Sequence, residues 1–154
     1  MKQRVPRRTW YSAAAAEQRR PRVLIEDDHP ALEISDFTAF REAGFDVAFC
    51  TGPRGTPGSC PLLRGADCEV VAGADVVLHG LGPESGVAAG IRWWHPEVPV
   101  VVKADPAAAP AGCASIPACC SVGGQVAAVR RTLQDAARDD AREDGPRENG
   151  RRED

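Results

Sequence analysis

The sequence predicts an α/β fold in which a doubly wound parallel sheet of about five strands carries helices on both faces. Two patterns support this fold class. Short apolar runs such as residues 74–79, which are typical of strands buried on both faces, alternate along the chain with segments of helical periodicity. The chain has 154 residues, of which 43% are hydrophobic, so it is long enough and apolar enough for one packed domain.

The first half of the chain contains two of the predicted strands, over residues 22–25 and 45–50. A helix is predicted between them over residues 31–43, because apolar residues recur on one face and a glycine follows its end. Residues 51–66 are dense in glycine and proline and indicate a long irregular loop. One or two helical turns are predicted over residues 68–72.

Three more strands and two more helices are predicted in the second half. The strands cover residues 74–79, 98–102 and 116–122, and Pro117 confines the last of them to an edge of the sheet. The helix over residues 87–94 places Trp94 on its apolar face and leaves Trp93 exposed. Residues 106–115 are rich in alanine, proline and glycine, a poor composition for a helix. The final helix is marked by the spacing of Val126, Val129 and Leu133.

Charge divides the chain into three parts. Residues 1–22 carry a formal charge of +6, residues 23–133 carry −6, and residues 134–154 carry −3. We therefore predict a disordered basic arm over residues 1–21, a folded domain over residues 22–133 and a disordered charged tail over residues 134–154. The folded part is acidic, which makes nucleic acid an unlikely partner.

Membrane insertion and export are disfavoured by the hydropathy pattern. The longest apolar run, residues 98–102, is far too short to cross a bilayer, and the apolar stretch near the amino terminus is too short for a secretory signal. A cytoplasmic location is therefore expected. The sequence also lacks the glycine-rich phosphate and dinucleotide motifs and the nucleophile elbow of common α/β enzymes, so we do not expect an enzyme.

Five blocks of sequence carry a resemblance to a known family. They read RVLIEDDHPAL at 22–32, EAGFDV at 42–47, ADVVL at 74–78, HPEVPVVV at 95–102 and AAVRRTL at 127–133. Together they resemble the receiver domain of bacterial response regulators. The acidic cluster between an apolar strand and His-Pro is the most specific of them. The resemblance implies a flavodoxin-like sheet and phosphoryl transfer, assisted by Mg²⁺, to a central aspartate.

The acidic cluster is the candidate metal site. The resemblance places the Mg²⁺-binding carboxylates on Asp27 and Asp28, or on Glu26 and Asp27 if the strand is one residue shorter. Magnesium favours one or two carboxylates together with water and phosphate oxygens. The alternative is a solvated acidic turn in which Asp28 or His29 caps the following helix.

The phosphoacceptor implied by the resemblance is missing. Counting forward from Asp75 places that position on Gly80, and counting back from Pro83 places it on His79. Neither residue is a carboxylate, and a lone histidine beside a strand end is more often a hydrogen-bonded structural residue.

Two other positions of the implied switch also lack the expected residue. The small hydroxyl residue expected after the fourth strand falls on Ala104, preceded by Lys103, and no lysine stands at residues 118–121 after the fifth strand.

The sequence thus predicts a degenerate, stand-alone receiver-like domain without an attached output domain. It would act through contact with a signalling protein, whether a kinase, a regulator or a second copy. The expected contact face consists of the fourth strand, the last helix and a helix between them.

Cysteines support the alternative function, a redox or metal sensor on the same scaffold. Cys50, Cys60 and Cys68 bracket the irregular loop, although their spacing lacks the paired knuckles of zinc sites. Reduced thiols with Cys50 packed as a small hydrophobe are the simpler interpretation. Cys119 and Cys120 are adjacent, so in a strand they would point to opposite faces.

Overall fold

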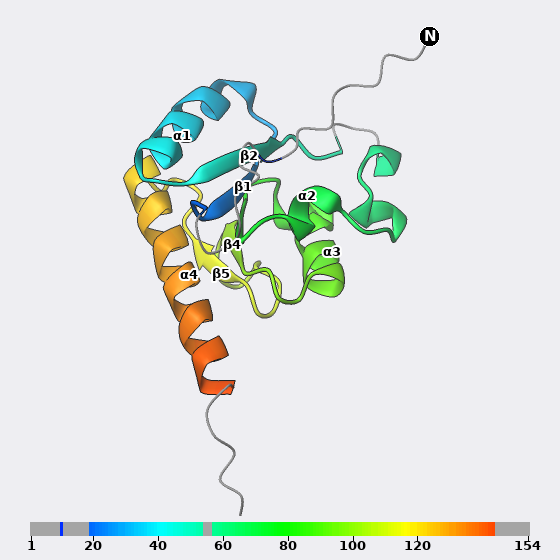
Figure 1. Cartoon of the computed structure of the whole chain (residues 1–154). Coiled ribbons are helices and arrows are strands. Elements are labelled where there is room, and N and C mark those ends of the chain that lie inside the picture. The colour runs from blue at the N-terminus through cyan, green and yellow to red at the C-terminus, as the bar shows by residue number, and fades with distance from the viewer. Residues whose placement is uncertain (1–9, 11–18, 54–56, 144–154) are drawn as a thin grey trace, which may run out of the picture.

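The predicted parallel sheet is present in the computed structural model, which describes residue 10 and residues 19–53 and 57–143 (Figure 1). All neighbouring strands are parallel, and their order is β2-β1-β3-β4-β5. This is the flavodoxin-like order of a doubly wound sheet, so the predicted fold class is confirmed. The strands are β1 (Arg22–Glu26), β2 (Asp46–Cys50), β3 (Val76–His79), β4 (Val100–Lys103) and β5 (Ala114–Ile116).

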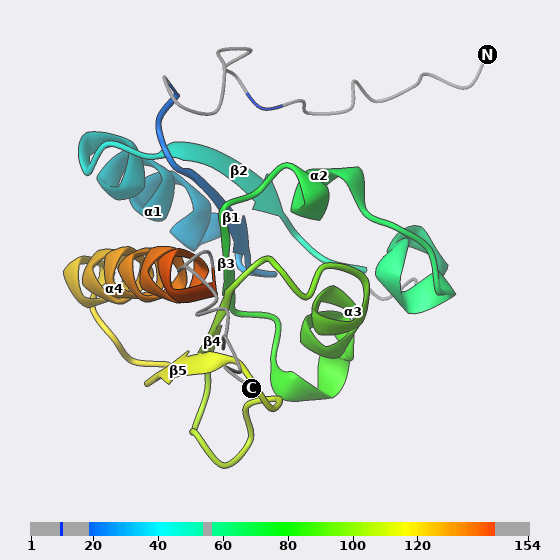
Figure 2. The same cartoon turned by 60° about the horizontal axis from the view of Figure 1, so that its bottom comes forward.

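Two helices cover each face of the sheet (Figures 1 and 2). Helices α1 (Pro30–Glu42) and α4 (Val122–Glu143) lie on one face, and α2 (Glu69–Ala72) and α3 (Val87–Trp94) lie on the other. Because side chains alternate along a strand, Val23 and Ile25 of β1 join the core beneath α1 and α4, whereas Leu24 joins the core beneath α2 and α3. Short 3-10 turns at Pro57–Ser59, Leu62–Arg64 and Pro83–Ser85 complete the chain path.

The fifth strand lies earlier than the sequence predicts. It covers Ala114–Ile116 at the edge of the sheet, so the prediction over residues 116–122 is wrong apart from its first residue. Pro117 has no N–H to donate to a neighbouring strand, and the strand ends immediately before it. Cys119 and Cys120 consequently lie in the turn before α4, not on opposite faces of a strand.

The contact face expected from the sequence is incomplete. Residues 104–113, between β4 and β5, form turns and no helix, as their composition indicates. The placement of Trp94 is also wrong: 41% of this residue is exposed, together with 81% of Trp93. Helix α3 has only eight residues, and its buried face is already supplied by Val87, Ala88 and Ile91.

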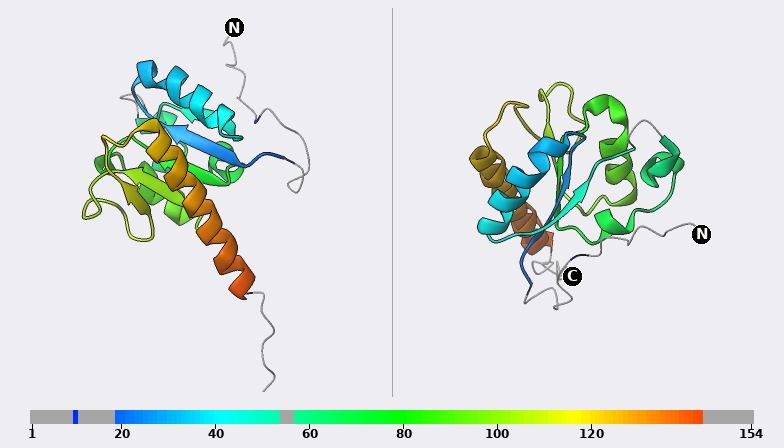
Figure 3. Two further views of the ribbon diagram at one scale, coloured as in Figure 1. Left: turned by 90° about the vertical axis from the view of Figure 1, so that its left-hand side faces the viewer. Right: turned by 90° about the horizontal axis from the view of Figure 1, so that it is seen from above.

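The ends of the domain extend beyond residues 22–133. Helix α4 continues to Glu143 and so includes the first ten residues of the predicted disordered tail, and its last turns project beyond the sheet (Figure 3). At the other end, Trp10 packs against the core beneath α2 and α3, and Arg19 forms an ion pair with Asp75. The remaining residues of both predicted tails lie outside the described ranges. Among the described residues, no helix combines the length and apolar character needed to span a bilayer.

Arg19 and Asp75 fasten the segment before β1 to the segment before β3. The guanidinium donates to both oxygens of Asp75, at 2.5 and 2.9 Å, and the backbone N–H of Arg22 donates to the same carboxylate at 2.7 Å. Burial opposes ionisation of Asp75, but these hydrogen bonds outweigh it, so the pKa of this carboxyl lies below its ordinary value.

We expect Asp75→Asn to lower the free energy of unfolding by about 1–2 kcal/mol at pH 7, because the charge-assisted hydrogen bonds are lost at a partly exposed site. A carboxyl whose pKa is depressed by folding stabilises the protein above its unfolded pKa. The difference from wild type should therefore shrink as the pH falls through the lowered folded pKa. Urea unfolding at neutral and acidic pH measures this, with the exposed Asp139→Asn as control. A loss that is independent of pH would contradict the prediction.

Candidate functional site at the carboxyl edge of the sheet

The sheet brings the acidic cluster and the end of β3 together. Glu26, the last residue of β1, is in register with His79, the last residue of β3. Asp27 and Gly80 follow at the same edge, and the backbone N–H of Gly80 donates to the carbonyl of Glu26 at 2.7 Å. The segment after β1 is also held on its other side, because the N–H of Asp27 donates to the carbonyl of Cys50 at 3.1 Å.

Glu26 and His79 form a buried pair. Their side chains are 2% and 0% exposed, and Nδ1 of His79 lies 2.6 Å from Oε2 of Glu26. The other ring nitrogen of His79 lies 3.4 Å from the carbonyl oxygen of Gly82. Both side chains are thus satisfied inside the protein, in agreement with the structural role predicted for His79. Glu26 is directed into this pair and does not join Asp28 in the acidic cluster.

Asp27, Asp28 and His29 form a cluster in which three potential ligand atoms lie within 4.8 Å of one another. The imidazole lies between the two carboxylates, with its Nδ1 at 3.2 Å from Asp27 and 2.7 Å from Asp28. The backbone N–H of His29 also donates to Asp27, at 2.9 Å. Asp27 is buried, whereas Asp28 and His29 are exposed.

Lys103 supplies a cation that the sequence analysis missed. It is the last residue of β4, and its ammonium lies 3.3 Å from Asp27 and 3.9 Å from Asp36. All three side chains are more than nine-tenths buried. The sequence did contain a signal for this contact. Lys103 ends an apolar strand, and in a parallel sheet the carboxyl end of that strand lies at the same edge as Asp27.

Asp36 was also missed by the sequence analysis. It belongs to α1 and lies on the same helical face as Phe40, four residues later, which directs it toward the sheet. Burial raises the pKa of Asp36, Lys103 acts in the opposite direction, and the charge of Asp27 adds to the increase. The ammonium of Lys103 thus lies close to both buried acids and lowers the cost of burying their charges.

Gly80 supplies no side-chain ligand at this position, and a Cβ added there would make close contacts. A Cβ built on it would lie 3.0 Å from Oδ2 of Asp27, 3.0 Å from the carbonyl of Glu26 and 3.4 Å from Cδ of Lys103. The end of β3 thus faces Asp27 and the lysine side chain directly. A side chain added here would enter the space between the acid and its cation.

Magnesium takes one or two carboxylates together with water. Beyond Asp27 and Asp28, the end of β3 adds no carboxylate to the cluster, because the residue that follows it is Gly80. Each carboxylate of the cluster already has a nitrogen partner, His29 for Asp28, and His29 with Lys103 for Asp27. A magnesium ion at this cluster would therefore have to displace the contacts of His29 and Lys103 with these carboxylates.

Two of the thiols predicted as an alternative site, those of Cys50 and Cys68, lie near Glu26, but none belongs to the group of Asp27, Asp28 and His29. Cys50, Cys60 and Cys68 are free and half-buried, and they do not gather into a group with ligand atoms within 4.8 Å among the described residues. Burial raises the pKa of Cys50 to about 11 and raises that of Cys68 as well. Because the thiolate is the reactive and metal-binding form, this environment does not favour a redox or metal sensor.

Solved structures of similar fold are receiver domains. The signal receiver domain of an HD domain-containing protein from Pseudomonas fluorescens Pf-5 is 16% identical, with a TM-score of 0.58, over 85% of this chain and 99% of that chain. A response regulator receiver domain protein from Clostridium thermocellum is 14% identical, with a TM-score of 0.58, over 76% and 97% of the two chains.

NtrX from Brucella abortus, solved in complex with ATP, is 15% identical with a TM-score of 0.60, over 86% of this chain and 31% of NtrX. No protein-family model matches the sequence, and no curated protein matches it either. At these identities the similarity concerns the fold, and the chain has the fold of response regulator receiver domains. The resemblance identified in the sequence is confirmed at that level.

We expect Lys103→Met to lower the free energy of unfolding by ~3 kcal/mol at neutral pH, because it leaves two buried carboxylates without their cation. The loss should diminish toward acidic pH, because burial raises the pKa of Asp36 and its protonation removes one of the two buried charges. Chemical unfolding across pH measures both effects. The matched control is Arg138→Met, which removes an exposed ion pair with Asp135 and should cost less than about 0.5 kcal/mol. Equal losses in the two variants would show that the buried contact is unimportant.

Proposed function

We propose that this chain is a receiver-like signalling domain that acts through contact with a protein partner and not through phosphorylation of an aspartate. The observation that carries the proposal is the position of Lys103. Its ammonium lies on Asp27, directly beside the carboxyl end of β3, where Gly80 presents no side chain. The receiver-domain fold supports the signalling class, and the chemistry at this edge supports the loss of the phosphoryl step.

Phosphoryl transfer to a carboxylate needs an acceptor and positive charge that is free to neutralise the phosphate oxygens. At this edge the acceptor position holds Gly80 or, in the alternative alignment, the buried His79. The available positive charge of Lys103 is already committed to two protein carboxylates. We therefore infer that the edge neither binds Mg²⁺ as a working cofactor nor holds a phosphoryl group. The proposal assigns no catalytic residue.

The contact surface that supports this proposal is the end of α3. Trp93 and Trp94 are the large hydrophobic residues exposed among the described residues, and they are adjacent. Tryptophan is enriched among residues that dominate the energy of protein interfaces. We infer that a signalling protein binds to the surface defined by Trp93 and Trp94, and not to the face around residues 104–113, where the expected helix is missing.

Incubation of the full chain with Mg²⁺ and acetyl phosphate, followed by intact-mass measurement, tests the loss of phosphorylation. We expect no phosphoryl adduct on the wild-type chain. The variant Gly80→Asp combined with Lys103→Thr restores a carboxylate and frees Asp27, so it should bind Mg²⁺ more tightly than wild type in a calorimetric titration. Gly80→Asp alone is the control, since the new acid would pair with Lys103. A phosphoryl group on wild-type Asp27, Asp28 or His29 would overturn the proposal.

We expect Trp93→Ser to abolish partner binding while changing the free energy of unfolding by less than about 0.5 kcal/mol, because the side chain makes little buried contact. The measurement compares signalling proteins retained by the immobilised full chain and by the variant, together with sedimentation of each to detect self-association. Arg131→Ser on exposed α4 is the matched surface control. Retention that is unchanged by the tryptophan substitution would argue against this surface.

A further inference from the structure

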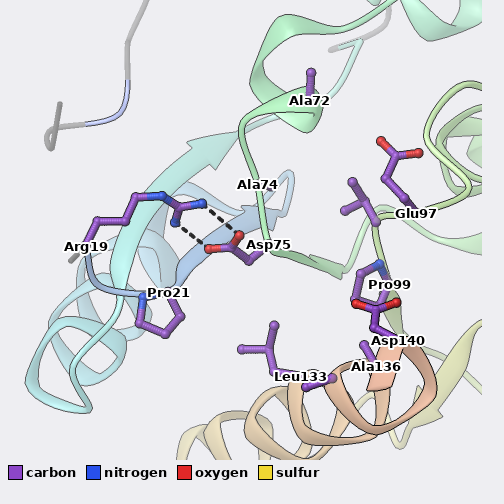
Figure 4. A pocket seen from close by; sticks show the side chains of 12 residues that line it. Arg19, Pro21, Ala72, Ala74, Asp75, Glu97, Pro99, Leu133, Ala136 and Asp140 are labelled. Carbon is purple, nitrogen blue, oxygen red and sulfur yellow. Dashed lines mark hydrogen bonds and ion pairs between the residues drawn. The ribbon is translucent and has the colours of Figure 1, made fainter. Parts of the chain in front are cut away.

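A groove lies at the amino end of the sheet, opposite the acidic cluster (Figure 4). Its volume is about 560 Å³. One wall is the projecting half of α4, and the other consists of the segments that lead into β1, β3 and β4. None of the residues of the candidate functional site lines it, so its role is separate from the function proposed above.

The groove already accommodates one arginine. The Arg19 guanidinium lies on one side and is fixed on Asp75 by two hydrogen bonds. Two further carboxylates, those of Glu97 and Asp140, belong to the opposite side (Figure 4). Among the described residues, no ion pair joins either of these two to an arginine or a lysine, and Oε1 of Glu97 lies 3.5 Å from Nδ1 of His95. The lining therefore retains negative charge after Arg19 is counted.

The remaining lining is apolar and suits the stem of a long cation. Leu133, Ala136 and Ala137 of α4 face Val98 and Pro99 across the groove. An arginine can cover apolar surface with its methylene groups while its guanidinium reaches a carboxylate. Its planar and weakly hydrated head is better suited than the lysine ammonium to a partly enclosed site.

The chain itself supplies a basic segment next to this groove. Residues 1–9 contain Lys2, Arg4, Arg7 and Arg8 and no acidic residue. Trp10, which follows them, packs over Gly73, the neighbour of the groove-lining Ala72. Arg22 lies 5.4 Å from the centre of the Trp10 ring and supports this position. Trp10, the described residue that follows this segment in the sequence, therefore lies close to the rim of the groove.

We propose that the groove is a binding site for arginine side chains and that the arginines of residues 1–9 occupy it. Arg7 and Arg8 lie within three residues of Trp10, a span of at most ~10 Å of extended backbone. Tethering at this range provides an effective concentration in the millimolar range. Weak individual contacts with Glu97 and Asp140 are then sufficient for occupancy, because the segment does not have to be captured from solution.

The test uses the full chain and a synthetic peptide with the sequence of residues 1–9. Amide NMR spectra are compared for wild type and for the full-length variant that combines Arg4→Gln, Arg7→Gln and Arg8→Gln. We expect shifts at Ala136, Ala137 and Glu97, and the peptide should bind the variant about tenfold more tightly than wild type, since the native segment no longer competes. Glu97→Gln with Asp140→Asn, added to the variant, should weaken peptide binding roughly fivefold to tenfold.

Matched controls remove the same number of acids away from the groove, with Glu84→Gln and Asp139→Asn, and should leave peptide affinity unchanged. A peptide whose three arginines are replaced by glutamine should not bind. Equal peptide affinity for wild type and the triple variant would mean that the groove takes the basic segment of another protein, which overturns the assignment to residues 1–9. Absence of binding to the triple variant would overturn the site as a whole. Neither result bears on the phosphorylation test.

Discussion

The contact of Lys103 with Asp27 and Asp36 is the constraint on which the carboxyl edge depends. The two acids come from different elements, the segment after β1 and the middle of α1, and both are nearly excluded from water. Two carboxylates buried close together repel each other and lose hydration, and a shared ammonium offsets both costs. The same contact connects α1 to β4 across the edge, so an electrostatic requirement also helps to position a helix.

The other acids at this edge also lie beside nitrogen groups of the protein. Glu26 lies within hydrogen-bond distance of His79 in the interior, and the exposed Asp28 lies 2.7 Å from Nδ1 of His29 at the surface. Every acid of the sequence EDD therefore has a nitrogen partner from the protein itself. In the folded chain, the acids that suggest a cation site in the sequence therefore contact nitrogen groups of the protein itself. This is the physical basis for proposing signalling by contact without a phosphoryl group.

The sequence predicted the architecture well and several boundaries poorly, for identifiable reasons. The apolar runs of β1, β3 and β4 are unambiguous because both faces of these strands are buried. The boundary of β5 was missed because Ile116 is adjacent to Pro117 and the strand has only three residues. Helix α4 continues past Leu133 without a buried face, supported by strong helix formers and not by the apolar periodicity used to predict it.

The sequence by itself determined the fold class, the order of the elements and the identity of the residues at and after the end of β3, His79 and Gly80 included, because these depend on local patterning and on single residues. Only the tertiary structure decided which charges meet. Lys103 and Asp27 are 76 positions apart in the chain, and Arg19 and Asp75 are 56 apart. Contacts of this kind exist only once parallel strands have been placed side by side, so no local pattern specifies them. The burial that makes the Lys103 contact decisive is likewise a property of the folded chain.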